Sequence, residues 1–170
     1  MHRSALNFFL IQATAIIQLL KQGKNLALVS DAGTPGVSDP GNQLINTTIE
    51  QYNNLTIIPI PGPSALVAAA SVSGLPMDRF VFMGFPPMKN KRKKFFEEAV
   101  NSKYSVIFYE SPYRIIKSLT ELAHCSHTGT MDEKLEAVVC RELTKKFETI
   151  YRGTIEEILK QLAKVTFIAP

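Results

Sequence analysis

Cysteine is scarce in this sequence, and two common ligand-binding patterns are absent from it. The 170 residues include only Cys125 and Cys140, too few for a disulfide framework, which favours a reducing cytoplasm. Their spacing from His124 and His127 fits no zinc pattern, so we predict no metal site. Neither the Gly-x-Gly-x-x-Gly pattern of dinucleotide sites nor the P-loop pattern occurs, which disfavours ordinary NAD and ATP sites.

Internal repeats and low-complexity tracts are also absent, and the composition is that of a folded protein. Hydrophobic residues make up 45% and charged residues 20% of the chain. A chain of 170 residues is long enough to bury the core of one domain or to form two small domains. The net charge of +4 favours an anionic partner such as nucleic acid. The first twenty or so residues imitate a signal peptide. Their apolar positions recur at helical spacing and stop at Gln22–Lys24, so we predict an amphipathic helix, with neither secretion nor a membrane partner.

The stretch Ser30–Gly41 is the feature most typical of a binding loop. It follows Asn25–Val29, an apolar run that predicts a buried parallel strand, and it precedes a helical pattern over residues 43–51. Three glycines and two prolines within twelve residues allow the backbone to approach a ligand closely. Strand, glycine-rich loop and helix form the unit that holds nucleotide-like ligands in α/β proteins. The alternative is a plain connection between a strand and a helix.

The same arrangement returns further along the chain. Leu55–Ile60 predicts a second strand, which opens into Pro61–Ala65 and a small-residue helix over Leu66–Ser73. The Ser64 hydroxyl stands at the first helical turn, where it either faces a ligand or serves as a plain helix cap. Small residues and a proline then indicate a domain boundary, with residues 1–75 in the first domain and 76–170 in the second.

The predicted second domain begins with a strand over Arg79–Phe85 and then a basic run. Lys and Arg neutralise backbone phosphates, so this run predicts an RNA-binding surface, and a solvated loop and helix start is the alternative. The run contains Lys89, Lys91, Arg92, Lys93 and Lys94.

Two further predicted strands end in charged residues. Tyr104–Tyr109 ends in Glu110, with Arg114 just before a helix. Leu135–Cys140 runs into a dense charged stretch that includes Arg141, Glu142 and Lys145. Such density is typical of a salt-bridged surface, or of a site if the two strand ends are neighbours. A short extended piece, a capping box at Thr154–Glu157, a last helix to Ala163 and a strand over Val165–Ala169 complete the prediction.

Five segments together resemble the tetrapyrrole methylase superfamily, and within it the bacterial 16S ribosomal RNA 2′-O-ribose methyltransferases. The segments occur in that family's order and approximate spacing, and the last two are similar to its RNA-modifying branch. They are Val29–Pro35 with Ser38–Gly41, Pro61–Ala65, Asp78–Phe80 with Gly84–Phe85, Phe108–Arg114, and Arg141–Glu148.

The resemblance implies an α/β fold of two domains with the cofactor crevice between them, the first domain being incomplete. It implies S-adenosylmethionine as cofactor, held by Asp31, Ala32, Gly33, Thr34, Ser64 and Ala65. It further implies methylation of the ribose 2′-oxygen of a cytidine in the decoding region of 16S ribosomal RNA, in a cytoplasmic homodimer that acts on that RNA or on the small subunit. Candidates for the chemistry are Glu110, Glu142 and Lys145 as base, with Arg114 and Arg141 suited to phosphates.

Parts of the family's pattern are missing from this sequence. Its opening strand with a Pro-Thr-Pro-x-Gly-Asn-type loop and its Glu-Asp-Thr-Arg motif do not occur, and Ala163–Lys164 replaces the usual Gly-Glu before the closing strand. We therefore expect the chain as given to be a poor enzyme, because positioning supplies most of the acceleration. A small-molecule C-methylase of the same fold and a non-catalytic remnant remain as alternatives.

Overall fold

Residues 14–30, 33–38, 41–51, 56–127 and 135–164 are described by a computed structural model of the chain. The chain divides into two compact units, Met1–Ser64 and Ala65–Pro170. The helix over residues 65–73 thus belongs to the second unit, whereas the sequence analysis assigned it to the first domain. The domain division at residue 75 stays a prediction for the family's domains. None of the described helices is long and apolar enough to cross a membrane.

Two helices form the regular structure of the first unit where its residues are described. Residues 14–21 are helical, and the helix is stopped at Gly23, which has a φ of 75°. The Gly23 amide closes the last turn by donating to the Leu20 carbonyl at 2.9 Å. This confirms the stop that Gln22–Lys24 predicts. Helix α2 (Asn42–Gln51) follows the glycine-rich loop as expected, and Thr48 in it donates its hydroxyl to the Leu44 carbonyl at 2.6 Å.

The two strands predicted for the first unit are wrong within the described residues. Residues 24–30 and 56–60 have no regular secondary structure, and no described segment pairs with them. Val29 is 81% exposed and Ile60 is 83% exposed, although an apolar run of this kind predicts a buried strand. A strand forms only where a neighbouring strand takes up its backbone hydrogen bonds, and no single-segment pattern supplies that neighbour.

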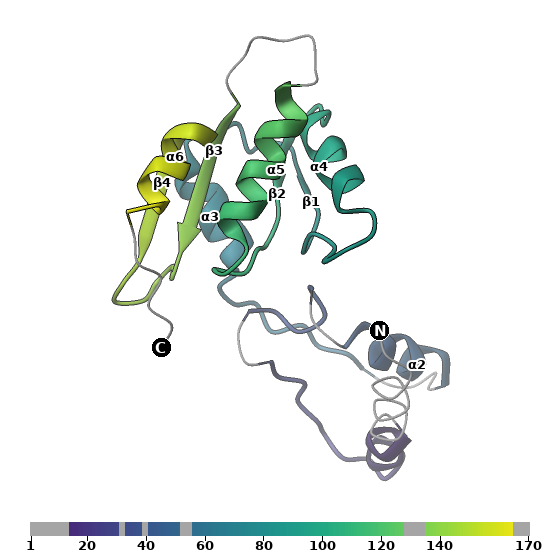
Figure 1. Cartoon of the computed structure of the whole chain (residues 1–170). Coiled ribbons are helices and arrows are strands. Elements are labelled where there is room, and N and C mark those ends of the chain that lie inside the picture. Colours follow the sequence, from purple (N-terminus) through teal and green to yellow (C-terminus); the bar gives the residue numbers. More distant parts are fainter. Residues whose placement is uncertain (1–13, 31–32, 39–40, 52–55, 128–134, 165–170) are drawn as a thin grey trace. The chain divides into compact units, whose positions relative to one another are not determined.

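The second unit contains the elements that the sequence predicts, in the predicted order (Figure 1). Their bounds are α3 (Ala65–Ser73), β1 (Phe80–Phe82), α4 (Arg92–Val100), β2 (Ser105–Ile107), α5 (Ile115–His127), β3 (Glu136–Arg141), β4 (Thr149–Thr154) and α6 (Ile155–Leu162). The mixture of helices and strands confirms the predicted α/β class. The predicted last strand over Val165–Ala169 lies outside the described residues.

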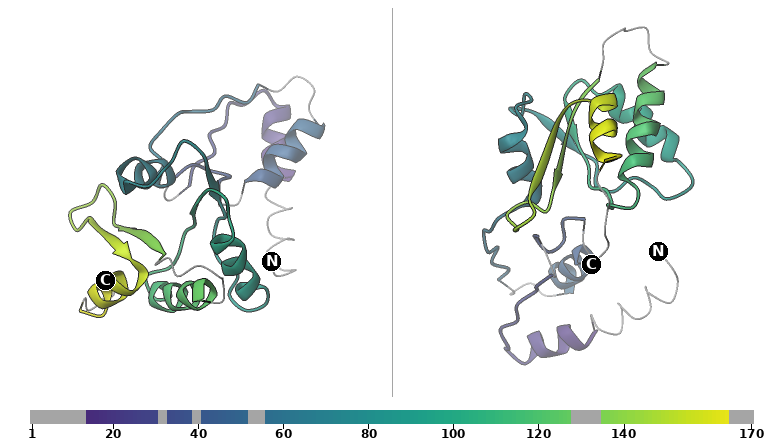
Figure 2. Two further views of the ribbon diagram at one scale, coloured as in Figure 1. Left: turned by 90° about the horizontal axis from the view of Figure 1, so that it is seen from above. Right: turned by 60° about the vertical axis from the view of Figure 1, so that its left-hand side comes forward.

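The strands pair two by two. β1 and β2 are parallel, with Val81 opposite Val106, and α4 makes the crossover between them. β3 and β4 are antiparallel, with Val139 opposite Tyr151. Helices α4, α5 and α6 lie on one side of the strands and α3 on the other (Figure 2).

The apolar core of the second unit lies among α4, α5, α6 and the strands. Phe96, Ile155 and Ile158 are at most 1% exposed, and Leu119 and Leu162 pack in the same cluster. Helix α6 enters this core because its start is fixed by the predicted capping box. Thr154 accepts a hydrogen bond from the Glu157 amide at 3.3 Å, and its own amide donates to the Glu157 carboxylate at 2.9 Å.

Candidate functional site

Three loops lie at one end of the second unit, those that follow β1, β2 and β3 (Figure 1). Because β1 and β2 are parallel, their carboxyl ends lie at the same edge of the sheet. Beyond both strands, the Tyr109 amide extends the pairing by donating to the Gly84 carbonyl at 2.8 Å. We call this end, formed by residues 83–91, 108–114 and 141–148, the carboxyl end. It carries the predicted catalytic residues and the first part of the basic run.

Glu110 is held in a closed network at the carboxyl end. Its side chain is 2% exposed and both of its oxygens have partners. Oε1 accepts from the Ser111 amide at 2.7 Å and pairs with Arg114 Nη2 at 2.9 Å. Oε2 accepts from the Ser118 hydroxyl at 2.5 Å and lies 3.5 Å from Arg92 Nη2.

Arg92 is the second centre of this network. Its side chain is 8% exposed. Its Nε donates to Glu121 Oε2 at 2.5 Å, and its Nη2 donates to the Ser118 hydroxyl at 2.6 Å. The guanidinium also lies 5.0 Å from the centre of the Phe96 ring, a cation–π distance. A planar fork with five donors suits this buried position better than the ammonium of a lysine would.

The network restricts access to Glu110. Both oxygens of its carboxylate already accept from charged and polar donors, and the side chain is almost closed to solvent. Arg114, by contrast, keeps 29% of its side chain exposed. Of this pair, Arg114 rather than Glu110 is therefore the side chain accessible from solvent.

The loop after β3 presents the other predicted catalytic residues. Glu142 and Lys145 are both exposed and their charged groups pair at 3.2 Å. Arg141, the last residue of β3, is half-buried. The backbone of the loop is unusual, because Glu142 and Thr144 both adopt left-handed conformations, with φ of 52° and 66°.

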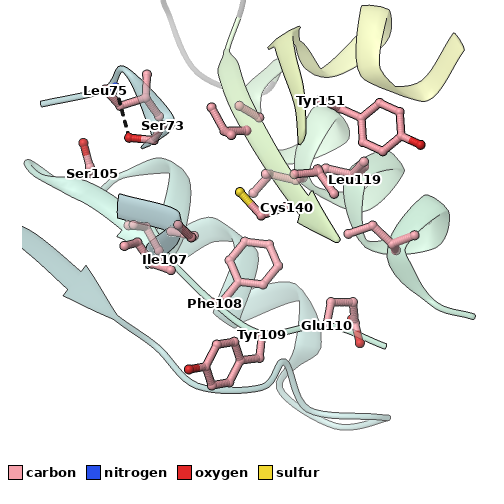
Figure 3. A pocket seen from close by; sticks show the side chains of 18 of the residues that line it. Ser73, Leu75, Ser105, Ile107, Phe108, Tyr109, Glu110, Leu119, Cys140 and Tyr151 are labelled. Carbon is pink, nitrogen blue, oxygen red and sulfur yellow. Dashed lines mark hydrogen bonds between the residues drawn. The ribbon is translucent and has the colours of Figure 1, made fainter. Parts of the chain in front are cut away.

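A pocket of about 770 Å³ lies between β2 and β3, within the second unit (Figure 3). Mostly apolar side chains line it, among them Ile107 and Phe108, and α3 contributes Ala69 and Ala70. Three of the predicted catalytic residues also line the pocket, namely Glu110, Arg141 and Glu142. The structure thus brings the ends of β2 and β3 to one cavity, the condition under which the dense charges suggest a site. The Cys140 thiol lines the same pocket, and burial raises its pKa above the ordinary value of 9.0.

The basic run separates into two kinds of residue. Lys89, Lys91, Lys93 and Lys94 are exposed, with the Lys93 side chain 86% exposed and 3.6 Å from Glu97. Lys91, the N-cap residue of α4, has a left-handed conformation. Arg92 alone points inward, where two carboxylates neutralise it. The sequence could not show which basic residue is buried, because that depends on how α4 packs against α5. We correct its assignment from RNA contact to buried structural cation.

The predicted cofactor residues are only partly described. Asp31 and Ala32 lie outside the described residues. Gly33 has a φ of 74° with open space beside its α-carbon, and the Thr34 carbonyl accepts from the Val37 amide at 3.2 Å. Ser64, half-buried, has no hydrogen-bond partner in the described part of the chain. Ala65 is exposed and begins α3.

Sequence reasoning missed side chains of the Glu110–Arg92 network and of the carboxyl end. Ser118 and Glu121 give no signal of their own, since a serine or glutamate within a helix is usually solvated. Tyr113 and Phe147 are 76% and 70% exposed. An aromatic residue inside a charged run is the signal that identifies Phe147.

Comparison with known proteins identifies relatives over nearly the whole chain. The family model described as Tetrapyrrole (Corrin/Porphyrin) Methylases matches residues 8–159. The ribosomal RNA small subunit methyltransferase I of Hydrogenobaculum sp. is 40% identical over 155 residues, which cover 91% of this chain and 64% of that relative. The protein of the same name from Xylella fastidiosa is 46% identical over 152 residues, covering 89% and 53%.

A third relative of that name, from Escherichia coli O157:H7, is 39% identical over 149 residues and covers 87% of this chain. The chain spans between 50% and 64% of the length of these three relatives. Among solved structures, the methyltransferase CobJ matches with a TM-score of 0.64 and 20% identity, covering 88% of this chain and 65% of that chain. At that identity the match shows the fold alone.

Proposed function

Because this chain belongs to the tetrapyrrole methylase family, we propose that it acts in the methylation of ribosomal RNA with S-adenosylmethionine as methyl donor. The observation that carries the proposal is the 39–46% identity to relatives named for small-subunit ribosomal RNA methylation. The charged carboxyl end supports it, since cationic side chains there suit a phosphate backbone. The finer proposal, from the motifs, is the ribose 2′-oxygen of a cytidine in the decoding region of 16S ribosomal RNA.

The described cofactor residues fit S-adenosylmethionine. The open space beside Gly33 suits a flat adenosine, and no described residue takes up the donor or the acceptor of the Ser64 hydroxyl. We propose that Gly33, Thr34, Ser64 and Ala65 contact the cofactor, together with Asp31 and Ala32. Thr34 and Ser64 offer hydroxyls that suit the polar groups of a nucleoside.

The charged side chains of the second unit divide the remaining tasks. When bound, S-adenosylmethionine would supply a methyl group on a positively charged sulfur; its transfer to the ribose 2′-oxygen would break the sulfur–methyl bond, leave neutral S-adenosylhomocysteine and release the hydroxyl proton. Glu142 and Lys145, exposed and 3.2 Å apart, are the candidates for receiving the proton. Arg114 and Arg141 are proposed to hold phosphates. The ordered Glu110–Arg114 pair contributes by alignment, which supplies more acceleration than a base does.

The proposed RNA surface extends to four exposed lysines. Lys89 belongs to the loop after β1, and Lys91, Lys93 and Lys94 lie at the start of α4. Each contact that neutralises a phosphate should contribute about 0.7 to the slope of log affinity against log salt on a single strand.

The test is methyl transfer from labelled S-adenosylmethionine to small-subunit particles that lack the modification. The full-length Xylella fastidiosa relative serves as the positive control, and we expect less incorporation by this shorter chain. A ribose 2′-O-methyl group blocks alkaline cleavage of its own linkage, so label in an alkali-resistant dinucleotide containing cytidine supports the finer proposal. Label in mononucleotides would instead mean base methylation.

Calorimetric titration separates cofactor binding from catalysis. Asp31→Ala and Ser64→Val should each weaken binding of S-adenosylmethionine without unfolding the chain. Unchanged affinity in both variants would remove these residues from the cofactor site.

A further inference from the structure

Phe147 presents an aromatic ring to solvent at the carboxyl end. Phe147 is 70% exposed, although phenylalanine is among the residues most often buried. One exposed apolar residue is ordinary on a protein surface. The backbone that carries this one is not ordinary, and it fixes the point from which the ring projects.

The loop from β3 to β4 is internally fixed on both sides of Phe147. The Lys145 amide donates to the Glu142 carbonyl at 2.9 Å, and the Glu148 amide donates to the Lys145 carbonyl at 3.1 Å. The Thr144 amide donates to the Glu148 carboxylate at 2.6 Å. The Phe147 carbonyl itself accepts from the Thr149 hydroxyl at 3.2 Å.

This fixed loop contains two residues in left-handed conformations, and neither is glycine. Glu142 has a φ of 52° and Thr144 a φ of 66°. Threonine is branched at Cβ, which makes its left-handed conformation costly. Strain of this kind persists where the surroundings fix it, and it is concentrated at ligand-binding sites.

The charges around the ring suit an anionic polymer. Lys145 and Lys146 immediately precede Phe147 and are exposed. The Lys146 Nζ lies 5.6 Å from the centre of the ring, and no other ring contact of Phe147 occurs among the described residues. The loops after β2 and β3 share the carboxyl end, so the exposed ring of Tyr113 and the cation of Arg114 belong to the same end (Figure 1).

We propose that Phe147 is a base-stacking residue, on which an unpaired base of single-stranded RNA lies while Lys146 meets a neighbouring phosphate. Stacking on an exposed aromatic ring beside cations is how proteins hold splayed bases. The proposal rests on the function proposed above, and adds to it that the RNA is recognised at an unpaired base.

The experiment measures fluorescence anisotropy of a labelled, short single-stranded RNA with the chain and its variants. Phe147→Ala should weaken binding on the order of 10-fold, whereas Phe147→Trp should bind like the parent because it keeps a stacking face. The salt slope of Phe147→Ala should equal that of the parent, since no charge is lost, and Lys146→Ser should lower it by about 0.7.

Tyr104 offers a matched control. It is 38% exposed, Lys103 Nζ lies 5.8 Å from the centre of its ring, and it precedes β2, at the opposite end of the strand from Glu110. Tyr104→Ala should leave RNA affinity unchanged. A second control is an RNA strand with abasic positions, which should bind the parent as weakly as intact RNA binds Phe147→Ala.

The outcomes distinguish this proposal from the one it rests on. If the parent binds RNA and Phe147→Ala binds it equally well, base stacking is overturned and the methyltransferase proposal stands. Equal losses in Phe147→Ala and Phe147→Trp would also overturn stacking, as would an abasic strand that binds like the intact one. If the parent neither binds RNA nor transfers methyl groups to particles, both proposals fall.

Discussion

Replacing Arg92 by methionine tests whether this residue of the basic run is structural. Methionine keeps an unbranched side chain and removes the guanidinium, which lies over the Phe96 ring. The change deletes the pair to Glu121 at 2.5 Å, the bond to Ser118 at 2.6 Å and the 3.5 Å contact with Glu110. The buried carboxylate of Glu110, 2% exposed, then loses one of the two cations that neutralise its charge.

The expected magnitude follows from these contacts. Removing one partner of a buried ion pair costs about 3–5 kcal/mol. Two observations place Arg92→Met at the lower end, about 3 kcal/mol. Arg114 still pairs with Glu110 at 2.9 Å, and the Glu121 side chain is 33% exposed, so water screens its loss. A loss of that size is a large fraction of the roughly 5–15 kcal/mol that stabilises a typical protein.

Urea unfolding followed by circular dichroism measures this loss, which should lower the midpoint by roughly 1–3 M if the slope is unchanged. Lys93→Met is the matched control, since that side chain is 86% exposed and should change stability by less than about 0.5 kcal/mol. The slope of log RNA affinity against log salt should fall for Lys93→Met, which removes an exposed cation, and should stay the same for Arg92→Met. An Arg92→Met protein that unfolds like the parent but shows a reduced salt slope would refute the reasoning.

Two further substitutions and one labelling reaction probe other parts of the second unit. Thr154→Ala removes the hydroxyl of the capping box and should lower the free energy of unfolding by about 1 kcal/mol in a urea titration, with Thr154→Ser recovering most of it. Phe96→Ala empties a fully buried position and should cost about 3–5 kcal/mol, so a loss under about 1 kcal/mol would mean that this core is loosely packed. Burial raises the pKa of the Cys140 thiol above 9.0, which keeps it protonated at neutral pH. Its alkylation by iodoacetamide, followed by mass spectrometry, should be slower than that of free cysteine and accelerate only in more alkaline solution, and equal rates at neutral pH would contradict the burial.

Local signals in the sequence were sufficient for the order of the helices and for two of their ends. The capping box at Thr154–Glu157 and the stop at Gly23 are confirmed, because a cap is formed by residues three or four apart. The order of helices and strands in the second unit is confirmed for the same reason, since each pattern lies within one segment. The motifs around Glu110 and Arg141 also placed the charged residues at strand ends correctly.

What the sequence left open depends on contacts between distant segments. The apolar runs over Asn25–Val29 and Leu55–Ile60 have strand composition, but whether they pair is decided by a neighbour that the run itself does not specify. Arg92 and Lys93 differ in the sequence only by residue type, yet the packing of α4 on α5 buries the first against Ser118 and Glu121 and leaves the second in water. A helix exposes successive residues about 100° apart, so only docking against a second element decides which cation turns inward and loses its access to RNA.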